Sequence, residues 1–450
     1  MRTRYSTTFV IFFAIILTTS VASGQEMHGH TMGSASAVDT SVAGLYRLLS
    51  QIEQHPILAE HRASLDASRH RIADKSSLAN PMLMLGVESI PTNSFSFSRE
   101  MMTGKMIGVS QMFPFPGKLA SERDIAAQDT VKSTFDLAEE RNTLRREVKL
   151  AYFDLYHLDR AIATNSVHVH SLDDLITSTE ARMTTGSATQ QDVLNLELER
   201  SDIRKQIIED ETMVAMKRTE LERAGGVSVS EIAIAAHLGL PALSYSLAQL
   251  DSIASANRAQ LAGIRSQDDK YAQQSKRNEM DKYPDFQVSL SYMQRDPLAA
   301  NTPLNPMPTT MPQSDLLSAS VSFELPFIRT NRREEATEEA NAMQTMARAE
   351  ERAAMLEIHT MLASDLARLA GLRREYDLLQ TEILPAASAS LATTNTNYTF
   401  NKATASDVLR NELTMLHRQH DVFQIEAEYN KTLAEIEYQT GADLVRYDGS

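Results

Sequence analysis

The sequence contains no cysteine among its 450 residues. Disulfide bonds, thiolate metal sites, thiol nucleophiles and lipidation at an N-terminal cysteine are therefore excluded. Glycine and proline are sparse, with 16 and 14 residues that occur in clusters, so long segments remain uninterrupted. Basic residues are not in excess either, since the formal net charge is −15. An acidic chain of this kind is not expected to bind nucleic acid. With 42% hydrophobic and 23% charged residues, the chain has the composition of a folded protein.

Long apolar runs are missing from most of the chain, and the exception lies at the N-terminus. An apolar stretch from Phe9 to Leu17 follows Arg2 and Arg4 and precedes small residues around Ala22. This pattern is typical of a secretory signal peptide, and the run is too short for a transmembrane helix of ~20 residues. We predict that residues 1–24 are a signal peptide; a membrane anchor is the alternative.

The motifs of common enzymes are also absent. The sequence has no G-x-S-x-G, no H-E-x-x-H and no P-loop. We therefore expect that the protein is not an enzyme and that it binds no cofactor. One local cluster, "EMHGHTMGS", lies in the segment 25–39 after the signal peptide and contains His28 and His30. Imidazole and thioether groups bind soft or borderline metal ions such as copper, which makes this a weak candidate metal site. The alternative is a flexible tail that binds nothing specifically.

An internal repeat is present. The segments "TGSATQQDVLNLELE" (185–199) and "FNKATASDVLRNELT" (400–414) share Ala-Thr, Asp-Val-Leu and Glu at one constant offset. Two upstream pairs recur in the same order: "ANPMLMLGVE" (79–88) with "KYPDFQVSLS" (282–291), and "SQMFPFPGK" (110–118) with "SFELPFIRT" (322–330). Three landmarks in one order indicate a duplication.

The duplication predicts the organisation of the mature chain: a first repeat at 40–224, a linker at 225–243, a second repeat at 244–440 and a tail at 441–450. Each repeat is expected to contain two strands, a long helix, a tip and a shorter helix. The expected strands are about 81–90, 106–115, 284–294 and 316–327; the long helices are about 117–183 and 330–396; the tips are 184–192 and 399–407.

The expected strands have two different faces. In "LLSASVSFELPF" (316–327) apolar residues alternate with Ser and Glu, which places them on opposite faces of a strand. Four strands are too few for a closed barrel, and an open sheet in lipid would leave unpaired edges. Three chains that pool their strands would provide twelve. A strand of a soluble sandwich is the alternative.

The long helices carry a heptad pattern. Ten residues spaced alternately by four and three form one seam with a single polar interruption: Leu144, Val148, Ala151, Leu155, Leu158, Ile162, Asn165, Val169, Leu172 and Ile176. A single helix over 117–183 would be ~100 Å long, more than a compact domain contains. The fold class is therefore predicted as mainly α with a transmembrane β-barrel.

The two tips resemble each other in their capping residues. Thr189 and Thr404 each precede an acid, Asp192 or Asp407, by three residues, as in a capping box. Plain helix capping explains these acids. The alternative is a surface that another protein recognises, with the acids lining an opening. The residues of this candidate surface are Thr185, Gly186, Ser187, Thr189, Asn401, Ala403 and Thr404.

Three segments together resemble the TolC-type outer-membrane efflux proteins: "QMFPFPGKL" (111–119), "RMTTGSATQQDVL" (182–194) and "YTFNKATASDVL" (398–409). The first is similar to the strand-to-helix junction of the heavy-metal efflux branch. The resemblance implies a TolC-like homotrimer, with a twelve-stranded barrel in outer-membrane lipid and a twelve-helix α-barrel that crosses the periplasm. It also implies a periplasmic adaptor (membrane fusion) protein at the tips and an inner-membrane pump of the RND type.

We therefore expect the outer-membrane channel of a tripartite efflux system, which passively conducts heavy-metal cations or drugs to the outside. Asp192 and Asp407 are then candidate acids of the periplasmic entrance. The alternatives are the exit duct of a type I protein-secretion system and a periplasmic coiled-coil scaffold without a pore. The substrate is not encoded in these patterns, because a passive duct selects little.

Overall fold

The structure, a computed structural model, describes residues 43–226, 228, 234–325 and 330–445, which all belong to one unit of the chain, residues 40–450. The expected signal peptide and the segment 25–39 with His28 and His30 lie outside the described residues. Residues 326–329, in the second strand-to-helix junction, also lie outside them.

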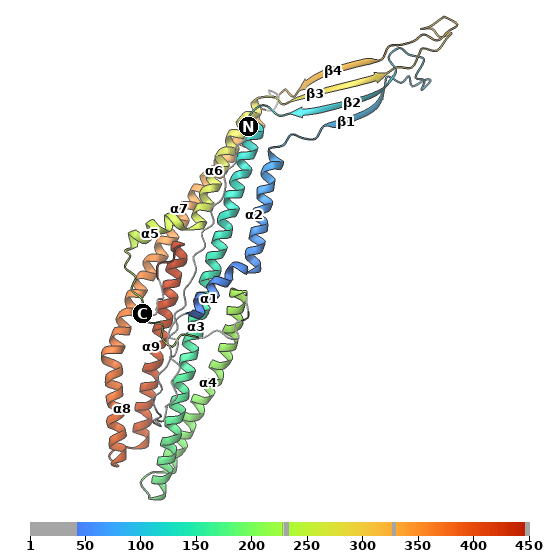
Figure 1. Ribbon diagram of the computed structural model, residues 1–450. Helices are drawn as coiled ribbons and strands as arrows, with labels where there is room; N and C mark the ends of the chain where they lie inside the picture. The colour runs from blue at the N-terminus through green and yellow to red at the C-terminus, as the bar shows by residue number, and fades with distance from the viewer. Residues whose placement is uncertain (1–42, 227, 229–233, 326–329, 446–450) are drawn as a thin grey trace, which may run out of the picture. The chain divides into compact units, whose positions relative to one another are not determined.

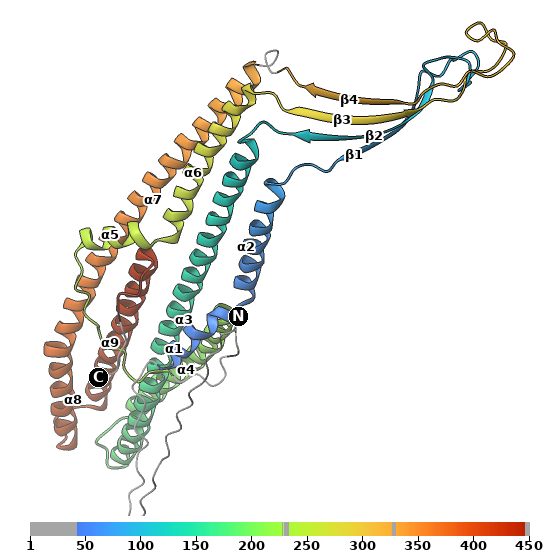
Figure 2. The same cartoon turned by 45° about the horizontal axis from the view of Figure 1, so that its top comes forward.

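Four strands form one antiparallel sheet in the order β1-β2-β3-β4 (Figures 1 and 2). Their bounds are β1 (Met82–Glu88), β2 (Gly104–Phe113), β3 (Phe286–Gln294) and β4 (Leu316–Phe323). Each repeat supplies one hairpin, and β2 of the first repeat pairs with β3 of the second. Within the described part of the chain, β1 and β4 each pair on one side only, so both edges of the sheet are open.

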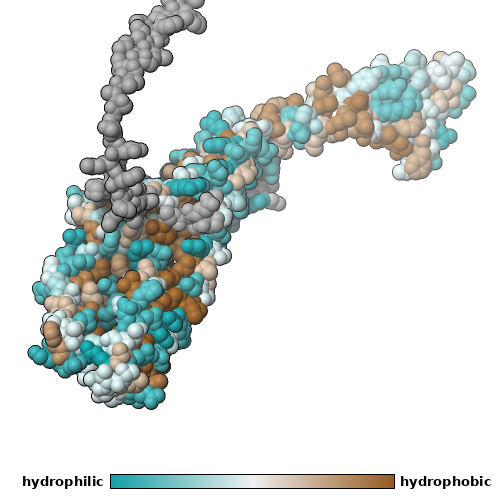
Figure 3. Space-filling view, turned by 60° about the horizontal axis from the view of Figure 1, so that its bottom comes forward, coloured by the Kyte–Doolittle hydropathy of each residue, from teal (hydrophilic) through white to brown (hydrophobic). Residues whose placement is uncertain are grey.

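The two faces of the sheet differ as the alternation predicts. The register aligns Leu83, Val109, Leu290 and Ala319 in one row, with serines in the adjacent rows of β3 and β4. The large apolar side chains of this face are solvent-exposed in the single chain. Figure 3 shows apolar side chains gathered over the strands and polar groups at the loop end. A single chain therefore presents an apolar surface that water does not favour.

The last strand is shorter than predicted. β4 ends at Phe323 rather than near residue 327, since Phe323 pairs with Phe286, the first residue of β3. Pro284, just before β3, has no N–H to continue the ladder.

Twelve helical segments are described: α1 (Ala43–Gln51), η1 (Ile52–Gln54), α2 (Pro56–Lys75), α3 (Lys118–Thr184), α4 (Gln190–Gly225), α5 (Leu247–Asn257), α6 (Ala259–Glu279), η2 (Met280–Lys282), α7 (Thr330–Leu378), η4 (Leu379–Ile383), α8 (Leu384–Thr399) and α9 (Ala405–Thr440). Within the described residues, none of these helices has both the length and the apolar character needed to span a membrane.

Helix α3 is the centre of the helical part. It is one continuous helix of 67 residues, and its heptad seam is largely buried, including the polar Asn165. Toward the sheet α3 packs against α2 and α6, and toward the tips it packs against α4 and α9. Near the tips, Leu172 of α3 shares a core with Leu196 of α4 and Leu416 of α9. The seam thus joins the two repeats along most of their length.

The second long helix is interrupted, contrary to the single helix expected at 330–396. A π-helical segment, η4, separates α7 from α8. Pro385 lies in the first turn of α8 and lacks the N–H that would bond to the carbonyl of Thr381. A π-helical turn accommodates such a lost bond, so the proline explains the interruption.

Ion pairs of the buried Lys118 with two partly exposed acids fix the junction between the sheet and the helices. Lys118, at the first residue of α3, lies 3.2 Å from Asp281 and 3.0 Å from Asp285. The Phe115 ring stacks on Tyr283 with 4.4 Å between the ring centroids. The "QMFPFPGKL" segment therefore holds the exit of the first hairpin against the entry of the second.

The helices form layers with the same two edges as the sheet. Near the sheet the contacts give the order α2-α3-α6-α7, and near the tips they give α4-α3-α9-α8. The elements β1, α2 and α4 of the first repeat lie at one edge, and β4, α7 and α8 of the second lie at the other. Exposed apolar side chains lie on the edge helices, including Leu194, Leu198 and Ile208 of α4 and Met346 and Leu356 of α7.

Candidate functional site

The tips of the two repeats have the same backbone construction. Gly186 has φ +76° and Asn401 has φ +57°, so each tip contains one left-handed residue just after the helix end. In the first tip Ser187 N–H donates to Arg182 O at 2.9 Å; in the second Lys402 N–H donates to Asn397 O at 2.8 Å. These bonds are those of a Schellman motif, in which glycine or asparagine takes the left-handed position. The same hydrogen-bonded turn therefore forms at both of the tips that the duplication predicts.

The tip acids close both capping boxes. The Asp192 carboxylate accepts hydrogen bonds from Thr189 N–H at 3.0 Å and from the Thr189 hydroxyl at 2.7 Å. Asp407 makes the same two bonds to Thr404, again at 3.0 and 2.7 Å. The backbone bond from Thr189 lowers the pKa of Asp192, and the hydroxyl bond from Thr404 lowers the pKa of Asp407. Both caps are therefore ionised at neutral pH and are lost only when the pH falls through these lowered pKa values.

The fold brings the two tips together around one cavity of about 260 Å³. Of the sequence-predicted residues, Ser187 and Asp192 line it from the first tip. The predicted residues that line it from the second tip are Asn401, Ala403, Thr404 and Asp407. Thr185, Gly186 and Thr189 do not line the cavity. The cavity makes this end of the molecule the candidate functional site.

Arg182 links the tips across the cavity. Its guanidinium donates to Asn401 Oδ1 at 2.5 Å and to Tyr398 O at 2.6 Å, and lies 3.8 Å from the centroid of the Tyr398 ring. The Tyr398 hydroxyl is in turn 2.8 Å from the Thr179 hydroxyl of α3. Three contacts of one side chain thus hold the end of α3 to the end of α8.

Arg182 does not pair with the acids of the capping boxes. Its hydrogen bonds go to Asn401 and Tyr398, and among the described residues it forms no ion pair with Asp192 or Asp407. Arg410 acts on Asp407 only through its charge. Tyr398 and Lys402, which also line the cavity, were not singled out from the sequence. A basic residue such as Arg182 is common in the last turn of a helix, so the sequence does not distinguish it. Its partners on the second repeat become visible only in the fold.

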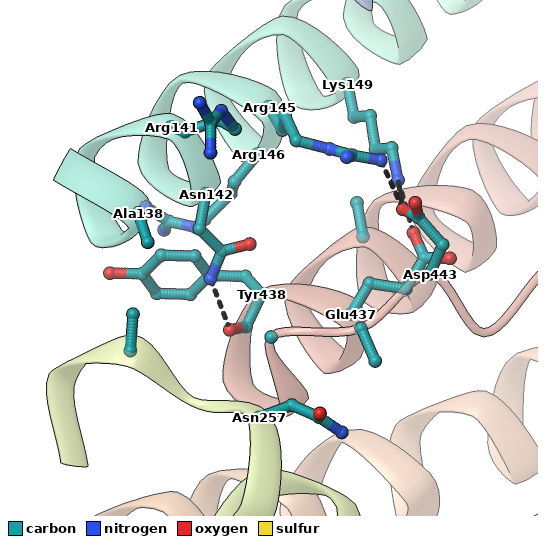
Figure 4. A pocket seen from close by; sticks show the side chains of 14 residues that line it. Ala138, Arg141, Asn142, Arg145, Arg146, Lys149, Asn257, Glu437, Tyr438 and Asp443 are labelled. Carbon is teal, nitrogen blue, oxygen red and sulfur yellow. Dashed lines mark hydrogen bonds and ion pairs between the residues drawn. The ribbon is translucent and has the colours of Figure 1, made fainter. Parts of the chain in front are cut away.

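A second pocket, of about 200 Å³, lies midway along α3 (Figure 4). Four basic side chains of α3 line it, but each already has an acidic partner. The pairs are Arg141–Glu53, Arg145–Asp443, Arg146–Glu435 and Lys149–Glu437. The ion pairs around this pocket therefore join α3 to η1 and to the C-terminal part of the chain. Because its basic groups are already paired, the pocket is not a binding site for an anion.

The pair of Lys149 and Glu437 should contribute strongly to stability. The Lys149 ammonium and a Glu437 carboxylate oxygen are 2.5 Å apart, with side chains only 6% and 5% exposed. Glu437→Ala leaves Lys149 buried beside only the more distant Asp443, at 3.8 Å. We expect a loss of about 3–5 kcal/mol, seen as a lower unfolding midpoint by circular dichroism. The double variant Lys149→Met/Glu437→Leu should recover most of the loss; an unchanged midpoint for Glu437→Ala would contradict the assignment.

A metal centre does not form among the described histidines and acids. Within the part of the chain that the structure describes, no three of these side chains lie close enough together to hold an ion. His168 is buried rather than solvated, with Nε2 3.0 Å from Gln419 Oε1 and Nδ1 3.4 Å from a Glu412 oxygen. It belongs to the packing between α3 and α9.

Comparisons with known proteins agree with this architecture. Residues 48–227 match the family described as "Outer membrane efflux protein". The matched range covers the first repeat from residue 48 onward and includes all of α4, and the second repeat has the same plan by duplication. No curated protein sequence matches the chain at a significant level.

Several solved structures share the fold over nearly their whole length. The outer membrane protein VceC of Vibrio cholerae is 16% identical, with 90% of this chain and 97% of that chain covered and a TM-score of 0.72. The structure of CusC, described in terms of folding and transmembrane channel formation, is 13% identical, with 90% and 94% covered and a TM-score of 0.74. The open state of the MtrE outer membrane channel of Neisseria gonorrhoeae is 13% identical, with 89% of both chains covered and a TM-score of 0.69.

The predicted fold class is confirmed by these neighbours and by the four-stranded, mainly helical architecture. The family and the similar structures are channel proteins rather than enzymes. The matched family is described as one of outer membrane proteins, and VceC is an outer membrane protein. The first repeat of the chain thus matches the outer membrane efflux protein family, and the whole chain shares the fold of these solved structures.

Proposed function

We propose that three copies of this chain form the outer-membrane channel of a tripartite efflux system. The observation that carries the proposal is that the sheet and both helical layers end at the same two edges. One edge belongs entirely to the first repeat and the other to the second. A copy can therefore place its first-repeat edge against the second-repeat edge of the next copy in every layer at once.

Such head-to-tail contacts form a ring when the rotation between copies closes. Three copies pool twelve strands, which gives β1 and β4 their missing partners and leaves no edge in lipid. The apolar face then meets lipid, and the serine-rich face lines the lumen. The exposed apolar side chains of α4, such as Leu198 and Ile208, then become buried against a neighbouring copy.

The partners follow from the position of the tips. The tips lie at the end of the long helices that is farthest from the sheet, where a periplasmic adaptor can dock. An inner-membrane pump of the RND type supplies the energy for export. The substrates are heavy-metal cations or drugs, and the "QMFPFPGKL" junction favours the metal branch. No observation favours an exit duct for type I secretion.

The proposal is tested on outer membranes of cells that express the chain. We expect a trimer that resists heat in detergent, and cells without the gene should become sensitive to the exported compound. The inner-membrane pump that co-purifies after cross-linking separates efflux from protein secretion. A monomeric protein that is released from membranes without detergent would contradict the proposal.

The loop 295–315 gives a test of orientation. The backbones of Leu298 and Met311 form a bridge, and the buried Asn305 amide donates to Thr309 O at 2.9 Å. The loop is therefore locally folded, yet Thr309 itself is exposed. We expect an epitope inserted after Thr309 to bind antibody on intact cells. Labelling only after rupture of the outer membrane would reverse the proposed topology.

A further inference from the structure

Methionines gather on the face of the sheet that is opposite to the apolar face. In the register, Met84 of β1 lies opposite Gly108 of β2, and Met106 of β2 lies opposite Gly86 of β1. Met106 also lies opposite Met293 of β3. These three side chains therefore occupy adjacent positions on three neighbouring strands. We refer to Met84, Met106 and Met293 as the methionine row.

Each side chain of the row extends over a glycine of a neighbouring strand. A Cβ added to Gly108 would lie 3.3 Å from Met84 Cε, and one added to Gly86 would lie 3.8 Å from Met106 Cε. At Gly104 an added Cβ would lie 2.8 Å from the Met293 sulfur, so any larger residue would displace that thioether. The glycines thus provide the space in which the three thioethers lie along the surface.

The rest of this face is rich in hydroxyl groups and carries two further methionines, Met82 and Met112, at the other end of β1 and β2. Ser110 of β2, Ser289 and Ser291 of β3 and Ser318, Ser320 and Ser322 of β4 share it. The one carboxylate of the described strands on this face, Glu88, is at the end of β1. Hard divalent cations prefer carboxylate oxygens, whereas thioethers select soft ions such as Cu(I). On a face that meets water, methionine contributes no core packing that would otherwise explain it.

We infer that the methionine row is a binding site for soft monovalent cations, Cu(I) and Ag(I), on the luminal wall of the barrel. This inference rests on the proposed function for the orientation of the sheet, and it specifies the substrate class. In a trimer the row recurs three times at one level, which gives nine thioethers around the lumen. Cations that reach this level exchange between these weak ligands, and the net charge of −15 favours their entry into the lumen.

The binding experiment uses the purified trimer in detergent and silver nitrate as the probe. The test variant is Met84→Leu/Met106→Leu/Met293→Leu, which keeps side-chain volume but removes the sulfur. The control is Met101→Leu/Met102→Leu/Met307→Leu, which removes three exposed loop methionines outside the row. We expect Ag(I) affinity to fall about tenfold or more in the test variant, with loss of Ag–S scattering in X-ray absorption, while the control changes little. Equal silver binding by the test variant and the wild type would overturn the inference.

A second arm separates this inference from the proposed function. In cells, the test variant should lower silver tolerance and leave export of an apolar cationic dye unchanged. An equal loss of dye export would mean that the row is an apolar lining for organic compounds, which also overturns the inference. If deletion of the gene changes no tolerance at all, the efflux function fails, while the silver titration still decides whether the row binds soft cations.

Discussion

Deletion of residues 81–115 should abolish the trimer while leaving a chain that can still form its helices. The deletion removes β1 and β2, and with them the partner of β3, so the remaining hairpin has an unpaired edge on both sides. Each unpaired backbone group in hydrocarbon costs several kcal/mol, which no helix contact can offset over a whole strand. Heat-resistant trimer in outer-membrane extracts, followed by gel electrophoresis, should fall below detection. Deletion of the other hairpin, 284–327, should have the same effect.

A loop deletion provides the matched control. Replacement of residues 300–310 by a short Gly-Ser linker removes the bridge of Thr302 with Asn305 but none of the strand partners. Its trimer should persist at near wild-type amount. If trimers survive either hairpin deletion, the strands are not pooled between copies, and the proposed barrel is wrong.

Much of this fold could be predicted because it is specified locally. The alternation of Ser and apolar residues predicts which face of β4 is apolar, and the structure agrees. The spacing of Thr189 and Asp192 predicts a capping box, which forms with both of its hydrogen bonds. Each of these patterns spans only a few residues, and most of them occur in both repeats.

The candidate site could be predicted only in part. The tip residues were identified, but the contacts that join the tips connect Arg182 with Tyr398 and Asn401, which lie more than two hundred positions away. The sequence does not show that Met293 joins Met84 and Met106, because Met106 and Met293 become neighbours only when β2 pairs with β3. The π-helical turn was missed although its cause, Pro385, is visible in the sequence, because helix periodicity continues across it.

Arg182→Ala should release the tips and increase the conductance of the purified trimer in a planar bilayer. The substitution removes two charge-assisted hydrogen bonds and the contact with the Tyr398 ring. The net contribution of such a bond to stability is about 1.5–3 kcal/mol, and a cation–π contact at an exposed site contributes about 0.5–1 kcal/mol. Because Arg182 is only partly buried, we take about 2 kcal/mol per chain, or about 6 kcal/mol for three chains. A change of about 5.5 kcal/mol moves a two-state equilibrium from 1:99 to 99:1, so three lost contacts suffice to change the resting state.

Two further variants test whether the contacts of Arg182 or the charges at the tips control the conductance. Arg410→Ala removes a cation at the same end of the chain that acts on Asp407 through its charge alone, so conductance should stay close to wild type. Asp192→Ala with Asp407→Ala removes both capping carboxylates and should lower the cation preference of the pore, at a cost of about 1 kcal/mol per cap. Trimer assembly should persist in all three variants, since none touches the sheet or the α3 seam. If Arg182→Ala conducts like the wild type while the double aspartate variant keeps its cation preference, the tips are only helix ends, and the channel must be closed elsewhere.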